Sequence, residues 1–435
     1  MNTTQSSASR SAWFTEARFG MFIHWGLYAI PGQGEWYRSH EKVSVEAYEP
    51  YFREFNPRSC DIRAWAKAAR EAGMRYMVFT AKHHDGFCLY DSKLTDYKST
   101  NTQGGRDFVR EYLEAARAEG LRAGLYYSLL DWHHPDYPKY GDKFHPMRGN
   151  EAFKNEKIDF NRYLEYMHGQ VEELVSGYGK LDVLWFDFSY DDMSGETWRA
   201  QDLVRMVRRY QSDVVIDNRL HAGGHSLESE NPDETAGDFA SPEQSLPEQG
   251  IVNNKGKPVP WELCTTMNNS WAYQPTDRRF KSAPLLIHKL VECVSKGGNL
   301  LLNVGPDANS RFPAESTKVL GEIGSWMELN GESIYGCGPA DLRRPDWGRY
   351  TRKGSVVYAH LFEEPIGPIP LSGIAPEQVK SVRLLRDGSE VKDAGTALGA
   401  RNKKDTKFVT LAISPNDTWP LPDTCDTVLK IELTE

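Results

Sequence analysis

Charged residues recur where apolar runs of this sequence end. Residues 183–186 (VLWF) are apolar, β-branched or aromatic without helical spacing, which is typical of a strand buried on both faces. This run ends on Asp187, and a charge that closes a buried strand is costly unless it is paired or faces a cleft. In a β/α barrel the carboxyl ends of the strands meet in one cleft, which holds the active site. Asp187 is therefore either a strand end that meets solvent or a catalytic carboxylate.

Other apolar runs are followed by polar groups in the same way. These are His24, Glu35, His83, His84, Trp132, His133 and Arg219, with Glu228, Glu230, Glu234 and Glu243 in a long acidic loop. Glycoside hydrolysis needs one ionised carboxylate, to attack the anomeric carbon or activate water, and one protonated carboxyl group for the leaving group. Aromatic faces pack on sugar rings, and His and Arg bind hydroxyl groups. If the strand ends converge, the sequence predicts a glycosidase site.

A metal site is the main alternative for the histidines. His83 and His84 precede Asp85, and His133 and His134 follow about 50 residues later. Adjacent residues at a strand end point to opposite sides, so we expect only one of His83 and His84 to face a given ion. The sequence has no HExxH motif and no cysteine ligand set, so we predict no metal and no cofactor. It also lacks GxSxG and P-loop motifs.

Strands and helices alternate along most of the chain. Strands are predicted at 18–25, 75–81, 121–128, 183–187, 214–217, 261–267 and 298–304, and helices at 60–72, 108–119, 153–178, 198–210, 285–294 and 317–329. This alternation predicts a parallel sheet, most economically a (β/α)8-type TIM barrel over residues 13–336. An eighth strand is not identified. An open doubly wound sheet is the alternative, which the lack of GxGxxG after the first strand disfavours.

The two ends of the chain differ from this pattern. Residues 1–12 are polar and predicted to be disordered. Residues 337–435 contain short alternating β-rich runs at 355–360, 379–385, 407–413 and 427–433, separated by turn residues. They predict a C-terminal antiparallel β-sandwich. The α/β barrel and the sandwich together account for the chain outside its first residues.

Composition excludes several classes of protein. The 435 residues carry a net charge of -9, whereas nucleic acids and anionic membranes favour basic proteins. No apolar run approaches the 18 residues typical of a membrane-spanning helix. The six cysteines form no CxxC pair, which indicates free thiols in a reducing compartment. Without a visible apolar leader we expect a cytoplasmic protein, with a trimmed secreted or periplasmic form as the alternative. A homo-oligomer is left open.

Five motifs together resemble the α-L-fucosidases of glycoside hydrolase family 29. They are residues 19–26 (FGMFIHWG), 35–37 (EWY), 82–87 (KHHDGF), 184–187 (LWFD) and 295–306 (SKGGNLLLNVGP). The resemblance runs in order from about residue 13 to residue 335. It implies a β/α barrel followed by a β-sandwich, and a retaining exo-enzyme that removes terminal α-L-fucose without a metal.

The same resemblance assigns roles to residues. Asp187 becomes the nucleophile. The residues implied to contact the fucose are His24, Glu35, Trp36, His83, His84 and Trp185, with Arg219 facing the site, Trp271 against the C5 methyl group and Tyr127 on the same wall. The acid/base comes from the loop after the fifth strand, and residues 237–244 (GDFASPEQ) point to Glu243. Glu230, Glu234 and Glu262 are the other candidates. Phe188 and Ser189 stand where the family more often has Gly, on the aglycone side.

Two rival functions remain at this point. One is another retaining exo-glycosidase, for example one acting on the configurationally similar β-D-galactosides. The other is a non-catalytic sugar-binding protein on an enzyme scaffold, although both candidate carboxylates are present.

Overall fold

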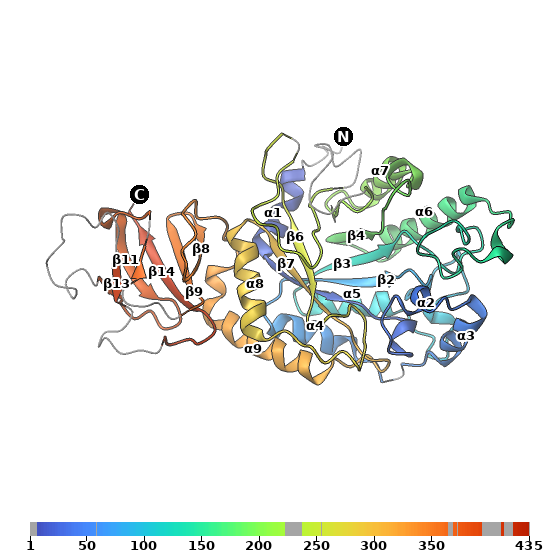
Figure 1. The fold of residues 1–435 in the computed structure, drawn as a ribbon, viewed down its shortest axis with the longest axis horizontal. Coiled ribbons are helices and arrows are strands. Elements are labelled where there is room, and N and C mark those ends of the chain that lie inside the picture. Colours follow the sequence, from blue (N-terminus) through green and yellow to red (C-terminus); the bar gives the residue numbers. More distant parts are fainter. Residues whose placement is uncertain are drawn as a thin grey trace.

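A curled sheet of seven parallel strands forms the centre of the N-terminal part of the chain (Figure 1). The computed structural model describes residues 7–57, 59–221, 237–253, 255–363, 369–371, 373–393, 410–412 and 421–434. The strands are β1 (Phe19–Ile23), β2 (Tyr76–Lys82), β3 (Arg122–Ser128), β4 (Val183–Asp187), β5 (Val215–Ile216), β6 (Glu262–Thr266) and β7 (Asn299–Val304). All seven predicted strands are confirmed.

The strand order shows how the sheet winds. It is β5-β4-β3-β2-β1-β7-β6, so successive strands are added in one direction around the sheet. A doubly wound sheet reverses that direction, so the doubly wound alternative is wrong, and the seven strands form a curled parallel half-barrel. The break in the order lies between β5 and β6. There, isolated parallel bridges join Asp217 to Phe239, Ala240 to Trp261 and Glu243 to Cys264, so residues 239–243 touch both edges without forming a regular strand.

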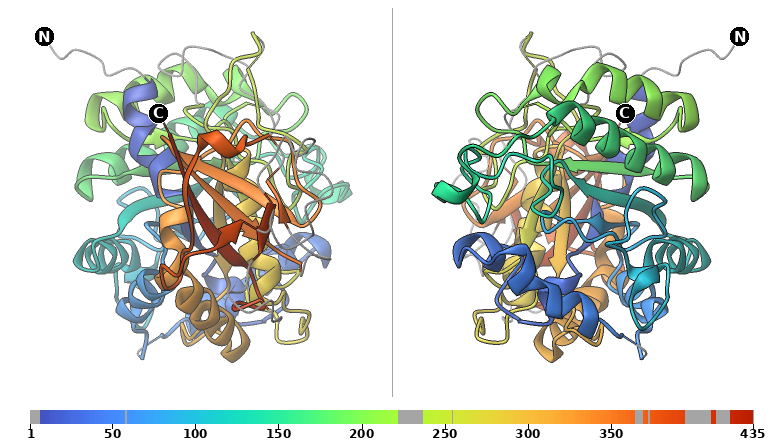
Figure 2. Two further views of the ribbon diagram at one scale, coloured as in Figure 1. Left: turned by 90° about the vertical axis from the view of Figure 1, so that its left-hand side faces the viewer. Right: turned by 90° about the vertical axis from the view of Figure 1, so that its right-hand side faces the viewer.

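Most helices surround the outside of the curled sheet (Figure 2), whereas the N-terminal helix places Phe14 in the apolar cluster inside the sheet. The helices are α1 (Ser7–Ala17), α2 (Tyr37–His40), α3 (Val45–Glu54), α4 (Ile62–Glu71), α5 (Phe108–Ala118), α6 (Phe160–Gly177), α7 (Ala200–Tyr210), α8 (Ala283–Ser295) and α9 (Ala314–Asn330). Three of the predicted helices begin at a side-chain N-cap. Asp61, Asp107 and Ser282 accept hydrogen bonds from the first-turn amides of α4, α5 and α8, respectively. The segment predicted to be disordered, residues 1–12, is helical from Ser7.

The C-terminal part contains two antiparallel sheets. One has the order β11-β14-β9-β8, and the other β10-β13-β12. The bounds are β8 (Gly348–Lys353), β9 (Val356–Leu361), β10 (Ile369–Pro370), β11 (Val379–Leu384), β12 (Lys392–Asp393), β13 (Thr410–Ala412) and β14 (Thr427–Leu433). Both sheets contribute to one hydrophobic cluster, which includes Val357, Leu429 and Ile369. The predicted antiparallel runs at 355–360, 379–385 and 427–433 are confirmed, and of the run at 407–413 the described residues 410–412 form a strand. β8 was not predicted.

This C-terminal part packs beside α8 and α9 (Figure 1). His288 Nε2 donates to the carbonyl of Cys425 at 2.7 Å, and Trp326 Nε1 donates to that of Asp426 at 3.1 Å. The six cysteines are free. Within the described ranges, no helix combines the length and the apolar character that crossing a bilayer requires.

Candidate active site

A pocket opens at the carboxyl ends of the parallel strands. Its lining consists of Phe22, His24, Glu35, Trp36, His83, His84, Tyr126, Trp185, Asp187, Phe188, Glu243, Cys264 and Trp271. These residues come from β1, β3, β4 and β6 and from the segments that follow β1, β2, β4, β5 and β6, so the sheet brings distant parts of the sequence together. Nine of the eleven residues predicted for the site line this pocket.

Asp187 is the last residue of β4 and reaches into the pocket. Its Oδ2 accepts a hydrogen bond from Tyr126 at 2.8 Å, and its Oδ1 lies 3.0 Å from Arg219 Nη1. Burial raises the pKa of Asp187 to about 6, although Arg219 and Tyr126 lower it. Asp187 is therefore a deep carboxylate whose anionic form is held by two donors.

Arg219 links the two candidate catalytic carboxylates. Its Nη1 donates to Asp187 and, also at 3.0 Å, to Glu243 Oε2. Its Nε and Nη2 donate to the hydroxyl and carbonyl of Ser241, and its guanidinium lies over the Trp185 ring, 4.6 Å from the centroid. Burial lowers the pKa of Arg219, but Asp187 and Glu243 raise it more, so this cation is permanent.

This shared donor limits the distance between the two carboxylates. Because both oxygens lie 3.0 Å from Nη1, they are at most about 6 Å apart. Glu243 is also the more open of the two, with 41% of its side chain exposed against 12% for Asp187. One acid thus lies deep in the pocket and the other at its entrance, where a leaving group and water have access.

Residues 238–243 bring Glu243 to the pocket. Asp238 is fully buried and paired with Arg10 of α1 at 3.1 Å and with Arg208 of α7 at 2.5 Å. The amide of Asp238 donates to Ile216 at the end of β5, and Cys264 of β6 donates its amide to Pro242. The segment is therefore anchored between β5 and β6 on both sides, which fixes where Glu243 projects.

His24 is held from behind by Asn303 of β7. His24 Nδ1 lies 2.6 Å from Asn303 Oδ1, and Asn303 Nδ2 donates to the carbonyl of Trp271 at 2.6 Å. Burial lowers the pKa of His24 to about 3, so the ring is neutral. Asn303 was not among the predicted site residues, although it lies in one of the five motifs.

His83 and His84 both face the pocket, so the prediction that adjacent histidines point to opposite sides is wrong. Their ring centroids are 4.1 Å apart. The reason is that the β2 pairing shifts register between Thr80 and Lys82 and the chain then turns, so strand alternation does not apply. Burial lowers the pKa of both rings.

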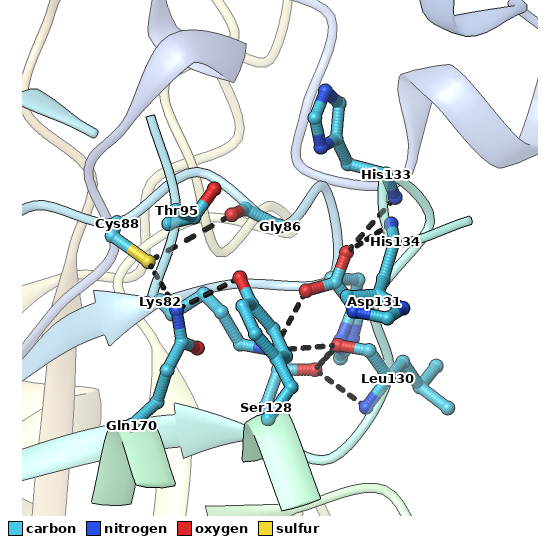
Figure 3. Close-up of polar contacts among 12 residues, drawn as sticks. Lys82, Gly86, Cys88, Thr95, Ser128, Leu130, Asp131, His133, His134 and Gln170 are labelled. Atoms are coloured by element: carbon cyan, nitrogen blue, oxygen red, sulfur yellow. Dashed lines mark hydrogen bonds and ion pairs between the residues drawn. The ribbon is translucent and has the colours of Figure 1, made fainter. Parts of the chain in front are cut away.

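A buried ion pair lies behind this turn (Figure 3). Lys82 Nζ is 3.2 Å from Asp131 Oδ2, and their side chains are 0% and 1% exposed. Asp131 Oδ1 also accepts the amides of His133 and His134. Gly86 has φ +80, and a Cβ there would meet Asp131 Oδ1 at 2.3 Å, so only glycine fits this turn. The pair therefore supports the turn that carries His83 and His84, while His133 stacks on Tyr97 outside the pocket.

Tyr127 does not line the pocket, so its predicted position is wrong. It is fully buried on the other face of β3, where its hydroxyl donates to Gln170 of α6 at 2.7 Å. Its neighbour Tyr126 points into the pocket instead and bonds Asp187. Side chains alternate along a strand, and both faces of β3 are buried, so the apolar pattern did not distinguish the two tyrosines.

The alternative acids fall into two groups. Glu262 is fully buried below the pocket, where its Oε1 accepts from Trp185 Nε1 at 3.2 Å and its Oε2 from the Tyr76 hydroxyl. Burial raises the pKa of Glu262 to about 7. Glu230 and Glu234 lie outside the described residues. Among the acids the structure describes, Glu243 is the candidate that shares the pocket and the arginine with Asp187.

The remaining lining residues form the rim. Glu35 Oε2 accepts the amide of Ala272 at 3.0 Å, and burial raises the pKa of Glu35. Trp36 packs edge-on against His84 at 5.0 Å. Phe188 has φ +87, a backbone region that favours glycine, which accords with the glycine that the resemblance places there. Its ring contacts Trp36, and so narrows the pocket next to the nucleophile.

Within the part of the chain that the structure describes, no three His, Cys, Asp or Glu side chains come together as an ion would require. That the reaction uses no metal stays a prediction.

The comparison with protein families covers most of the chain. The family whose sequence model matches is described as "Alpha-L-fucosidase", and the match spans residues 1–332. The chain belongs to the α-L-fucosidase family. It is therefore a glycoside hydrolase.

Known fucosidases share its sequence and its fold. The structure of α-L-fucosidase isoenzyme 1 from Paenibacillus thiaminolyticus is 55% identical with a TM-score of 0.94, over 99% of this chain and 100% of that chain. The tissue α-L-fucosidase of Bos taurus is 31% identical over 90% of this chain and 83% of its own length. A fucosidase of Bacteroides thetaiotaomicron, solved as a trapped covalent intermediate with 2-fluoro-fucosyl fluoride, is 29% identical with a TM-score of 0.83, over 100% of this chain and 98% of that chain.

Proposed function

We propose that this fucosidase-family protein is a retaining exo-α-L-fucosidase that removes terminal α-L-fucose from fucosylated glycans. The observation that carries the proposal is that Asp187 and Glu243 share one nitrogen of Arg219 in a single pocket. Retaining glycosidases separate their carboxyl groups by about 5–5.5 Å, and inverting ones by about 6.5–9.5 Å to admit a water. The upper bound of about 6 Å set by Arg219 supports the retaining geometry.

The mechanism follows from the different surroundings of the two acids. Asp187 attacks the anomeric carbon while protonated Glu243 gives its proton to the departing oxygen, and the glycosidic bond breaks. Glu243 then takes a proton from water, which attacks the fucosyl-enzyme and releases Asp187. Arg219 and Tyr126 hold Asp187 as the anion, and the exposed position of Glu243 suits exchange of leaving group and water.

The pocket also supports exo action. Its inner end is closed by Phe22, Trp185 and Tyr126, which belong to the apolar cluster inside the sheet. One terminal sugar therefore fits this proposal better than a chain passing through. We assign His24, Glu35, Trp36, His83, His84 and Trp185 to the fucose hydroxyls and Trp271 to the methyl group.

We also propose that residues 239–243 complete the barrel as an irregular eighth segment between β5 and β6. Their parallel bridges to both edges support this. Such irregularity is common beside active sites, because it re-aims a side chain. In this proposal the segment gives up regular strand pairing so that Glu243 points at the pocket.

A substrate panel with product analysis tests the function. We expect turnover of aryl α-L-fucosides with α-L-fucose as the first anomer seen by NMR, and aryl β-D-galactosides turned over at least about 10²-fold more slowly. First release of β-L-fucose would contradict retention, and preference for the galactoside would favour the rival exo-glycosidase. Fucose binding without turnover would identify a sugar-binding protein.

The pKa of Asp187 predicts the acidic limb of the pH profile. A raised pKa of about 6 means that Asp187 is protonated, and so inactive as a nucleophile, below that pH. We expect kcat/KM on an aryl α-L-fucoside to fall as pH drops through about 6. Tyr126→Phe removes a donor that stabilises the anion, so it should move this limb to higher pH. An unchanged limb in Tyr126→Phe would contradict the assignment.

Glu262 provides a direct check on the choice of acid/base. Glu262→Gln keeps an acceptor for Trp185 and a polar partner for Tyr76, so we expect kcat/KM within about threefold of wild type. Glu262→Leu leaves both buried donors unpaired, at about 1–3 kcal/mol each, so its Tm should drop. If Glu262→Gln instead loses activity only on substrates with poor leaving groups, Glu262 is the acid and Glu243 is not.

A further inference from the structure

The hydrogen-bond chain behind His24 determines which of its ring nitrogens carries a proton. The chain starts at the carbonyl of Trp271, which can only accept. Asn303 lies 2.6 Å away, so the nitrogen of its amide must face that carbonyl and its oxygen must face His24. Asn303 is 1% exposed, and this orientation gives both halves of its amide a partner.

The second link fixes the proton. Asn303 Oδ1 is also an acceptor only, so the contact of 2.6 Å requires a proton on His24 Nδ1. A neutral imidazole carries one proton, and burial keeps His24 neutral at neutral pH. Its other nitrogen, Nε2, then has a bare lone pair. Among the described residues, Nε2 has no hydrogen-bond partner, and His24 lines the pocket.

We infer that Asn303 locks His24 in the Nδ1–H tautomer. His24 Nε2 can then only accept a hydrogen bond, so it binds a sugar hydroxyl that donates its proton. This inference rests on the proposed function for the identity of the ligand, but the tautomer itself does not. Asn303 is a positioning residue, because it acts on the ligand through His24. It also holds the backbone of Trp271, so one amide sets both a polar and an aromatic wall of the pocket.

The contacts of Ser128 indicate that His84 also carries its proton on Nδ1. Its Nδ1 lies 2.7 Å from the hydroxyl of Ser128, which accepts the amide of Leu130 and lies 3.0 Å from the Leu130 carbonyl. If Ser128 gives its single proton to that carbonyl, all three contacts are hydrogen bonds and His84 Nδ1 must donate. Lys82 Nζ reaches the same carbonyl from the buried ion pair (Figure 3). His84 depends on a hydroxyl that can rotate, whereas His24 depends on an amide that cannot.

The tautomer can be observed without any assay of activity. In protein labelled with ¹⁵N-histidine, the His24 signals are assigned by their loss in His24→Gln. We expect a protonated Nδ1 and a bare Nε2 in the ligand-free protein between pH 7 and 8. A protonated Nε2, or rapid exchange between tautomers, overturns the inference even if the protein is an active fucosidase. An inactive protein with the expected signals would overturn the proposed function and leave the tautomer standing.

Two variants separate tautomer control from general support. Asn303→Asp keeps an acceptor for His24 Nδ1 but loses the donor to Trp271, so we expect Nδ1 to stay protonated. Asn303→Leu loses both, so we expect the proton to shift towards Nε2. A merely structural role would lower Tm in both variants without moving the proton. If the proton stays on Nδ1 in Asn303→Leu, Asn303 does not control it.

Ligand analogues test the consequence for recognition. L-Fucose analogues in which each hydroxyl in turn is replaced by hydrogen or fluorine are compared as competitive inhibitors. At the position facing His24 we expect fluorine to bind no better than hydrogen, and both about tenfold more weakly than hydroxyl, because fluorine cannot donate. In His24→Gln, whose amide can donate, fluorine should regain affinity over hydrogen at that position. If fluorine matches hydroxyl at every position in wild type, the inference fails.

Discussion

Replacing Asp187 with alanine is expected to lower kcat/KM on aryl α-L-fucosides by roughly 10⁴-fold or more, a loss of the size that follows removal of a catalytic nucleophile. The fold should survive, because Arg219 keeps its bonds to Glu243 and Ser241 and the vacated space adjoins the open pocket. The measurements are steady-state kinetics and Tm. Asp192→Ala, at an exposed position just beyond the same strand, is the matched control and should stay within about twofold of wild type.

The stereochemistry of rescue makes this result specific. In Asp187→Ala an added azide ion can enter the space of the lost carboxylate and attack the anomeric carbon directly, with Glu243 still protonating the leaving group. The product is then the inverted β-L-fucosyl azide, with partial return of activity. Wild-type rates without azide would rule out Asp187 as the nucleophile.

The strands could be predicted because each one is marked by a continuous apolar run in its own local sequence. Runs such as 183–186 are apolar throughout, since a parallel sheet covered by helices buries both faces. The polar residue after each run then marks the open end of the sheet, which is how His24, Asp187 and Arg219 were found. The same double burial explains the error at Tyr127, because a strand that is apolar on both faces does not show which face points inward.

The helix α1 was missed because long-range contacts stabilise it. Its sequence is mostly small and polar, without a clear apolar stripe. Phe14 packs against Tyr76 and Phe239, with ring centroids 5.5 and 4.6 Å away, and Arg10 pairs with Asp238. These partners are distant in sequence from α1, so the local sequence does not predict the helix.

The segment at 238–243 presents the same problem at the site itself. Its sequence (DFASPE) has no strand periodicity, and its position depends on a buried aspartate held by two arginines from separate helices. The choice of Glu243 therefore came from family resemblance. The structure adds a physical reason, since Arg219 connects Glu243 to Asp187.

Glu243→Ala should have a large effect that depends on the leaving group. A substrate whose aglycone leaves as a stable anion needs no proton, so fucosylation of Asp187 should be little slowed by the loss of the acid. For an alkyl or sugar aglycone we expect a loss of about 10²–10⁴-fold in kcat/KM, the usual contribution of general acid–base catalysis. The measurement is a series of α-L-fucosides with aglycones of increasing pKa, for which the variant should show a steeper dependence than wild type.

Azide again identifies the role, with the opposite stereochemistry. In Glu243→Ala the fucosyl-enzyme still forms on Asp187, but water lacks its base, so with a good leaving group the intermediate accumulates. Azide needs no base and attacks from the face that water would use, so it should accelerate turnover and give the retained α-L-fucosyl azide.

Glu248→Ala, which changes an exposed glutamate of the same connection between β5 and β6, is the control and should show neither effect. If Glu243→Ala also yields the β-azide, or loses activity equally on all aglycones, then Glu243 acts by positioning Arg219 and the proton donor lies elsewhere. The pair of variants thus tests the geometry as a whole, because opposite anomers are expected only if Asp187 and Glu243 lie on opposite sides of one sugar ring.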